Sequence, residues 1–238
     1  MATGRHTSDS LAKAASPALR PQSACAIMVR ICASAWFLAL SAAAVSAAAS
    51  SFEGIAAGNA APCAWLDLIS EGLVALFYII IFVIMLLRPE PVSQARRLWP
   101  AILALSGSYG AWFIPLLPHG PADAGLKTAS ALILFVAEAL MIYTLLRLGR
   151  SFSLLPQARK LVTGGPYAIV RHPLYLAEET AIAGMLLQYA WFAALPFLAF
   201  HAAVQIWRML IEEAVLHETF PEYALYARQT PRILPWIW

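Results

Sequence analysis

Long runs of apolar residues constrain this chain more than any other feature. Residues 66–87 (LDLISEGLVALFYIIIFVIMLL) and residues 128–148 (TASALILFVAEALMIYTLLRL) are apolar, and each reaches the length of about 20 residues that a helix needs to cross a bilayer. Only 12% of the residues are charged, whereas ordinary soluble domains contain about 25%. The sequence therefore predicts an all-α, polytopic integral membrane protein.

Three other segments also suit a membrane. Residues 98–117 are apolar but interrupted by Gly, Ser and Pro, and residues 174–190 and 191–210 follow each other without a polar spacer. The last two predict a tight hairpin, or one long helix kinked near Pro196. With residues 31–50, these segments predict five to six transmembrane helices and a short cytoplasmic C-terminal tail. No repeat and no strand pattern is visible.

The N-terminal region divides into two segments. Residues 1–30 are rich in Ser, Ala and Pro, which is typical of a disordered or artefactual leader. Residues 31–50 fit either a first transmembrane helix or, if translation starts at Met28, a signal peptide. We expect two transmembrane helices in residues 51–127 and a membrane core with its tail in residues 128–238.

Positive charges are distributed unevenly among the loops. Residues 88–97 contain three arginines and residues 147–172 contain five basic residues, whereas residues 118–127 have only Lys127 beside Asp123. Short cytoplasmic loops are enriched in Lys and Arg. The first two loops and the tail are therefore predicted to face the cytoplasm, in an inner (plasma) membrane.

Composition excludes several other partners and sites. The net charge is only +3 and shows no clustered basic face, so no nucleic acid is expected as a partner. The three cysteines have no paired spacing, and no metal site is predicted. Nothing in the sequence fixes the oligomeric state.

One polar cluster interrupts the apolar sequence at residues 165–179, GPYAIVRHPLYLAEE. Pro173 suits the first turn of a helix, where its missing N–H has no partner to lose. At about 100° per residue, one face of that helix then presents four polar side chains: His172, Tyr175, Glu178 and Glu179. The glutamates also fit simple capping of the helix dipole, and Arg171 fits a positive-inside anchor.

A second polar stripe lies on the last apolar segment. Four residues fall within about 60° of arc: His201, Gln205, Arg208 and Glu212. Ionisable groups at membrane depth cost about 2.5–3.5 kcal/mol on insertion scales and usually face a protein interior or a cavity. A packing role for His201 and an interfacial position for Arg208 are the simpler interpretations, but the alignment favours a cavity wall.

Two further carboxylates need a partner or a role. Glu213 lies about 100° around the helix from Glu212, so we expect the two to have different roles. Glu138 lies in mid-span, where pairing with His201 or Arg208 on another helix is the favoured interpretation and a catalytic role, as a base, stays open. The whole set predicts a pocket at the membrane surface for a polar cofactor from water and a lipidic substrate from the bilayer.

Residues 148–178 and 208–235 contain three motifs: GPY-x-x-x-RHP-x-Y from Gly165, R-x-x-x-EE-x-x-L from Arg208 and FPEY-x-x-Y-x-x-x-x-PR from Phe220. In this combination they resemble the isoprenylcysteine carboxyl methyltransferase family and the related phospholipid N-methyltransferases. The resemblance covers about residues 128–238. It departs at Ala177, where the family often has glycine, and at Gly164, where it usually has a small hydroxyl residue.

The resemblance implies S-adenosylmethionine as the cofactor and methyl transfer to a lipidic or prenylated substrate. It favours a carboxylate as the acceptor and leaves an amine, thiol or hydroxyl open. It implies eight cofactor-binding residues: Tyr167, Arg171, His172, Pro173, Tyr175, Arg208, Glu212 and Glu213. It implies catalytic roles for His172, Glu179 and Arg208. Tyr223 and Tyr226 are then expected to form an aromatic wall in a tail folded over the cofactor.

Two alternatives remain open. A steroid-reductase-like membrane enzyme binds NADPH instead, and its site needs additional positive charge for the pyrophosphate. A non-enzymatic membrane scaffold uses the motif only for structure, and it should then tolerate substitution of His172 or Glu213 as long as it folds.

Overall fold

The computed structural model describes residues 24–58, 64–94, 99–121 and 123–234 of the 238-residue chain. Residues 1–23 of the predicted leader lie outside the described residues. The elements in chain order are α2 (Ala24–Ala56), α3 (Ala64–Leu87), β1 (Ser93–Gln94), α4 (Trp99–Tyr109), η1 (Gly110–Leu116), α5 (Ala124–Leu148), η2 (Gly149–Ser151), β2 (Gln157–Ala158), η3 (Gly165–Ala168), α6 (Pro173–Leu186), α7 (Trp191–Thr219) and α8 (Tyr223–Gln229).

In the described part of the chain, four segments are long and apolar enough to cross a membrane: Ile27–Ala56, Ala64–Leu87, Ala124–Ser151 and Trp191–Thr219. They contain α2, α3, α5 and α7. The all-α, polytopic architecture is therefore confirmed. Helix α2 begins within the predicted leader and includes residues 31–50, so this segment is a helix in the full chain.

Two of the predicted spans are shorter than expected. Residues 98–117 form the 11-residue α4 followed by a seven-residue 3-10 helix that contains Pro115. Residues 174–190 yield α6, whose 14 residues reach about 21 Å at a rise of 1.5 Å per residue, short of a hydrocarbon core of about 30 Å. Length and composition therefore support four long spans among the described residues, not five to six.

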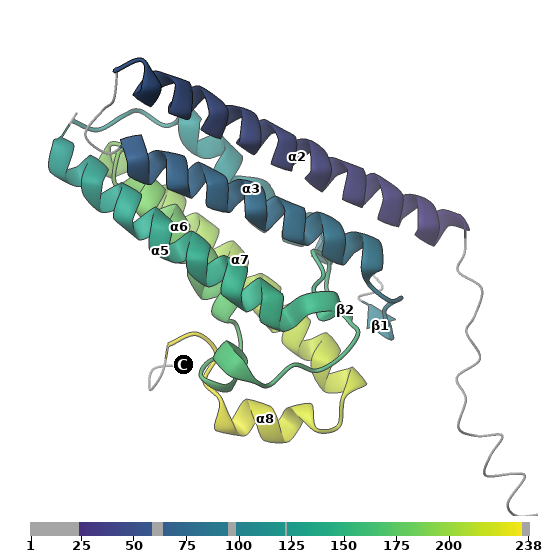
Figure 1. Cartoon of the computed structure of the whole chain (residues 1–238). Helices are drawn as coiled ribbons and strands as arrows, with labels where there is room; N and C mark the ends of the chain where they lie inside the picture. The colour runs from purple at the N-terminus through teal and green to yellow at the C-terminus, as the bar shows by residue number, and fades with distance from the viewer. Residues whose placement is uncertain (1–23, 59–63, 95–98, 122, 235–238) are drawn as a thin grey trace, which may run out of the picture.

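The helices pack as a bundle, with α2 along α3, α3 along α5 and α5 along α6. Figure 1 shows α2, α3 and α5 side by side, α6 and α7 behind them, and α8 across one end. An apolar cluster that includes Phe37 of α2, Ile81 and Met85 of α3 and Leu145 of α5 joins the front helices. Helices α4 and α6 both pack against α7, and this second layer contains the site described below.

Helices α6 and α7 form a hairpin, which confirms one of the two predicted alternatives. Only residues 187–190 separate them, and Ala190 N donates to the Pro118 carbonyl at 2.9 Å. Pro196 lies in the second turn of α7 and does not end the helix. The hairpin places the polar faces of its two helices next to each other.

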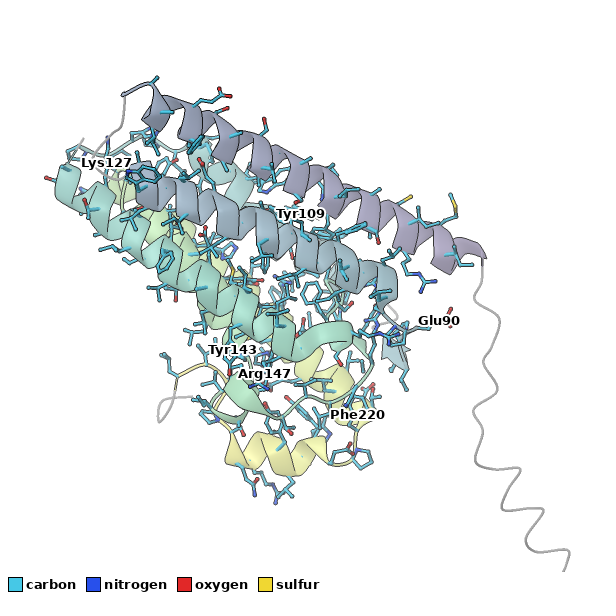
Figure 2. The ribbon with its side chains drawn as sticks, viewed as in Figure 1. Glu90, Tyr109, Lys127, Tyr143, Arg147 and Phe220 are labelled. Atoms are coloured by element: carbon cyan, nitrogen blue, oxygen red, sulfur yellow. The ribbon has the colours of Figure 1, made fainter. Side chains whose placement is uncertain are left out.

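A short antiparallel pairing was not predicted. Ser93 of β1 lies opposite Ala158 of β2, and Arg159 Nε donates to the Pro89 carbonyl at 2.9 Å. Two paired residues are too few to leave an alternating pattern in the sequence. The pairing joins the two arginine-containing loops that the sequence assigned to one membrane side. Figure 2 shows Lys127 at the other end of the bundle from Arg147.

Candidate functional site

The turn before α6 is hydrogen-bonded to the C-terminal tail. His172 is the N-cap residue of α6 and Pro173 occupies its first turn, as the sequence predicted. Arg171 N donates to the Pro231 carbonyl at 2.8 Å, and His172 N donates to the Arg232 carbonyl at 3.0 Å. The backbone of the tail therefore fixes the start of α6.

The polar faces of α6 and α7 meet along their length. Four side-chain pairs connect them: His172 with Glu213, Tyr175 with Glu212, Glu178 with Gln205, and Glu179 with His201. The two polar stripes that the sequence predicted therefore face each other in the structure. Because each pair satisfies groups that are costly to bury alone, the pairs also hold the hairpin in register.

Glu213 of α7 forms ion pairs with three basic side chains. Its carboxylate lies 2.8 Å from Arg171 Nη1, 3.0 Å from His172 Nε2 and 3.0 Å from Arg232 Nε. It is 8% exposed. Glu213 thus joins the motif before α6, helix α7 and the tail, whereas Glu212 receives the hydroxyl of Tyr175. The two carboxylates have different surroundings, as expected from their angular separation.

Arg208 is buried where α4, α6 and α7 meet. Its Nη1 donates to Gln205 Oε1 at 2.6 Å, its Nη2 donates to Ser108 Oγ at 3.2 Å, and its guanidinium lies over the Tyr175 ring, 4.9 Å from the centroid. A Cβ on Gly107 would come within 2.6 Å of Nη1. Glycine at this position is therefore what lets the guanidinium fit against α4.

A pocket opens beside these residues, with a volume of about 980 Å³ including its mouth. We call it the polar pocket. Six of the eight predicted cofactor-binding residues line it: Tyr167, Arg171, His172, Tyr175, Arg208 and Glu212. Pro173 and Glu213 do not line it, but Glu213 contacts two residues that do, Arg171 and His172.

Two residues for which the sequence predicted no pocket, Arg159 and Lys160, also line the polar pocket from the loop before the motif. Glu178, which the sequence placed on the polar face of α6, lines it as well. Burial, with a smaller effect of nearby Arg88, lowers the pKa of Arg159 to about 10, so its guanidinium stays charged at neutral pH. The run QARK at residues 157–160 was the sequence feature that could have indicated these two basic residues. It was interpreted only as part of a positively charged cytoplasmic loop.

Tyrosines form the side of the polar pocket nearest α8. Tyr223 and Tyr226 line it, as predicted, and Tyr226 Oη donates to the Tyr167 carbonyl at 2.6 Å. The Tyr167 hydroxyl is buried and has no hydrogen-bond partner among the described residues. Burial raises the pKa of Tyr167 and Tyr226, and it raises that of Tyr223 to about 12. All three phenols are therefore neutral at physiological pH.

Glu179 and His201 lie outside the polar pocket. The Glu179 carboxylate lies 2.6 Å from His201 Nδ1, and His201 Nε2 donates to the Gly107 carbonyl at 3.0 Å. Both ring nitrogens of His201 are thus bonded, which agrees with the simpler packing interpretation. Ala177 is fully buried and Gly164 borders open space, so neither departure from the family motif narrows this pocket.

A second pocket, also of about 980 Å³, adjoins the first; we call it the apolar pocket. Side chains from α2 to α7 line it, most of them aliphatic or aromatic. The two pockets share four lining residues: Ser108, Phe152, Leu154 and Glu178. A molecule in the polar pocket would therefore lie next to one in the apolar pocket.

Glu138 lines the apolar pocket. The expectation that it pairs with His201 or Arg208 is wrong, because those side chains are engaged by Glu179 and Gln205. Its carboxyl group interacts instead with Ser70 of α3. The partner was mispredicted because spacing along one helix does not reveal how neighbouring helices are rotated.

The residues around the polar pocket match a known protein family. Residues 126–223 match the phospholipid methyltransferase family. They form a domain of that family. The resemblance predicted from the three motifs is thereby confirmed, and this methyltransferase-family domain contains α5, α6, α7 and most of the lining of the polar pocket.

Individual proteins also resemble this chain. It is similar to the cobalt-zinc-cadmium resistance protein CzcN of Cupriavidus metallidurans (38% identity over 32% of this chain) and to the nickel-cobalt-cadmium resistance protein NccN of Alcaligenes xylosoxydans xylosoxydans (36% over 33%). The matches span 35% and 38% of those relatives. A solved structure of the eukaryotic intramembrane Ras methyltransferase, isoprenylcysteine carboxyl methyltransferase, is 25% identical, with a TM-score of 0.46 over 75% of this chain and 69% of that one.

Proposed function

We propose that the chain is an S-adenosylmethionine-dependent methyltransferase of the membrane. The polar pocket binds the cofactor, and the apolar pocket receives a lipidic or small hydrophobic acceptor from the bilayer. The observation that carries the proposal is the contact between the two pockets, inside a domain of a methyltransferase family. Transfer between two such molecules requires them to meet in this way.

The groups in the polar pocket fit the cofactor's chemistry. S-adenosylmethionine has a carboxylate, an ammonium, two ribose hydroxyls and an adenine ring. Arg159 Nη1 and Arg208 Nε line the pocket as buried donors without partners among the described residues, and an arginine is suited to a carboxylate. Glu212 and Glu178 supply acceptors, and Tyr223 and Tyr226 supply aromatic surface.

Catalysis would depend on positioning and on exclusion of water. S-adenosylmethionine supplies a methyl group on a sulfonium, which becomes a neutral thioether on transfer. Arg208 and His172 are both at most 5% exposed. Arg208 would hold the Tyr175 ring in place and His172 would hold Glu213. Helix α8 would cover the pocket. Correct orientation of two reactants can lower a barrier by about 7–11 kcal/mol. Glu179 positions His201, and through it α4.

The proposal also covers which side of the membrane the polar pocket faces and which chemical group accepts the methyl. The arginine-containing loops that pair through β1 and β2 would face the cytoplasm of an inner membrane, where the cofactor is made. The acceptor favoured by the sequence is a carboxylate, as in prenyl-cysteine methylation. The residues that line the apolar pocket determine which head group fits there.

Transfer of a labelled methyl group tests the proposal. Purified full-length protein is incubated with S-adenosylmethionine carrying a labelled methyl group and with lipid extract, prenyl-cysteines, or hydrophobic carboxylic acids, amines and thiols. We expect label in at least one solvent-extractable product, and loss of that product when Arg208 is changed to Leu. Lack of transfer to every acceptor class, with a folded protein, would contradict an enzymatic function and favour the scaffold.

A further inference from the structure

Four arginines from separate parts of the chain meet at the C-terminal end of α3. Arg30 of α2, Arg150 of η2 and Arg159 of β2 donate to the carbonyls of residues 88, 87 and 89, at 3.3, 2.7 and 2.9 Å respectively. The fourth arginine is Arg88, which directly follows α3. We call these four residues the arginine cluster.

Capping of α3 explains only part of this arrangement. The last carbonyls of a helix have no partner within the helix and have a partial charge of about −0.5, so guanidinium donors are favourable there. The arginine cluster has four full positive charges, because guanidinium groups stay protonated at physiological pH. The positive-inside rule requires basic residues near a membrane surface, but it does not require them to meet at one helix end. A large positive charge therefore remains.

The side chain of Arg88 has no countercharge in the described part of the chain. It is half-buried, and burial, followed by the charge of Arg30, lowers the pKa of its guanidinium. Among the described residues, no salt bridge involves Arg88, Arg150 or Arg159, and Glu90 is exposed. Like charges that are partly desolvated disfavour one another, so an anion bound here would stabilise the arrangement.

Exposed apolar side chains lie next to the arginine cluster. Val29 and Ile31 flank Arg30 on α2, and residues 86 and 87, both leucines, precede Arg88 on α3; all four apolar side chains are exposed. Helix α2 packs along α3, and its first turns lie at the end of the bundle where α3 ends (Figure 1). Positive charge above exposed apolar surface is complementary to a lipid that has an anionic head group and acyl chains.

We propose that the arginine cluster binds the phosphate of one anionic phospholipid, whose acyl chains lie along the exposed apolar residues of α2 and α3. Guanidinium groups form strong, often bidentate hydrogen bonds with phosphate, and basic sites between membrane helices bind anionic head groups. Arg30, Arg88 and Arg150 line neither the polar nor the apolar pocket. The inference therefore goes beyond the proposed function and does not rest on methyl transfer.

Native mass spectrometry of the purified full-length protein in neutral detergent tests the inference. Dioleoylphosphatidylglycerol and dioleoylphosphatidylcholine have the same acyl chains and a phosphate each, but only the first has a net negative charge. We expect one phosphatidylglycerol per chain to bind at least about tenfold more tightly than phosphatidylcholine, which corresponds to about 1.4 kcal/mol. Equal binding of the two lipids would overturn the inference.

Glycerol 1-phosphate, the soluble part of the same head group, distinguishes a lipid from a free phosphate. We expect it not to displace phosphatidylglycerol at equal concentration, because it has no acyl chains to bury against α2 and α3. Displacement at equal concentration would show a site for free phosphate and would contradict the lipid assignment.

Matched variants locate the site. Arg88→Gln is expected to weaken phosphatidylglycerol binding roughly fivefold, because one basic residue near the anionic lipid is lost, whereas Arg88→Lys keeps the charge and should keep most of the binding. Arg228→Gln, at an exposed position of α8, is the control and should bind as the unmodified protein does. Arg150→Gln provides a second test if Arg88→Gln fails to fold. An unchanged lipid preference in the folded variant would place the lipid elsewhere and contradict the assignment.

Discussion

At the scale of single residues, two adjacent glutamates have different roles although they are the same residue type. Glu212 accepts the Tyr175 hydroxyl and lines the polar pocket, whereas Glu213 neutralises Arg171 and Arg232 and lines neither pocket. Consecutive helical residues point about 100° apart, so the two carboxylates reach different partners. Substitution should therefore separate binding from stability.

Glu213→Gln is expected to destabilise the protein by roughly 3 kcal/mol, because breaking a buried ion pair leaves its cations without a countercharge. Glu212→Gln is expected to keep the stability and to weaken S-adenosylmethionine binding by about tenfold, since it removes a charged acceptor from the pocket. Thermal unfolding in detergent and equilibrium cofactor binding measure the two effects. Identical behaviour of the two variants would contradict the division of roles.

Gly107→Ala tests the close contact between α4 and Arg208. The added Cβ would come within 2.6 Å of Arg208 Nη1 and 2.9 Å of Gln205 Oε1, so we expect overpacking to cost about 1–3 kcal/mol and cofactor binding to fall. Gly72→Ala is the control, because a Cβ there meets nothing within 4 Å and alanine favours the helix by about 0.5–1 kcal/mol. A Gly107→Ala protein as stable as the Gly72→Ala protein would rule out the constraint.

At the scale of elements, the site is formed by a helical hairpin and a tail that crosses its end. Helices α6 and α7 present the polar pairs, and α8 is attached through Tyr226 Oη to the Tyr167 carbonyl. Figure 1 shows α8 across the end of the bundle where α7 ends, away from the turn at residues 187–190. The tail should therefore control access to the polar pocket.

Tyr226→Phe removes this attachment and leaves a carbonyl without its donor. We expect a cost of about 1–3 kcal/mol, confined to the tail, together with faster proteolysis or amide exchange in residues 220–234 and weaker cofactor binding. Tyr143→Phe, at a position that is 45% exposed on α5, makes the same chemical change and should alter none of these. Unchanged exchange in the Tyr226→Phe tail would show that other contacts hold α8.

The sequence predicted the elements whose polar residues repeat at helical spacing. The stripes from His172 to Glu179 and from His201 to Glu212 each lie on one helix face as expected, because angular position around a single helix follows from spacing alone. Contacts that depend on rotation between helices were not predictable, which is why Glu138 was given the wrong partner and Arg159 was overlooked. The length of α4 was overestimated because hydropathy does not register where Gly110 and Pro115 end a regular helix.

At the scale of the whole molecule, the polar and apolar pockets share one boundary, and the loops at one end of the bundle are joined by β1 and β2. Figure 2 shows Glu90 and Lys127 at opposite ends. If the arginine-containing loops face the cytoplasm, these two positions lie on opposite sides of the membrane.

Cysteine accessibility checks this orientation. In a protein whose native cysteines are replaced by serine, Lys127→Cys is expected to react with an impermeant maleimide added to intact cells. Glu90→Cys is expected to react only after the membrane is opened, because Lys and Arg near it favour the cytoplasmic side. The reverse labelling pattern would invert the topology and place the polar pocket away from cytoplasmic cofactor.

Equilibrium binding of labelled S-adenosylmethionine to the purified protein in detergent is the most direct test of the central claim, that α6, α7 and the tail enclose a site for this cofactor. The account predicts saturable binding of one molecule per chain, displaced by S-adenosylhomocysteine but not by NADPH, and lost in Arg208→Leu. No saturable binding to the folded protein, or displacement by NADPH alone, would contradict it.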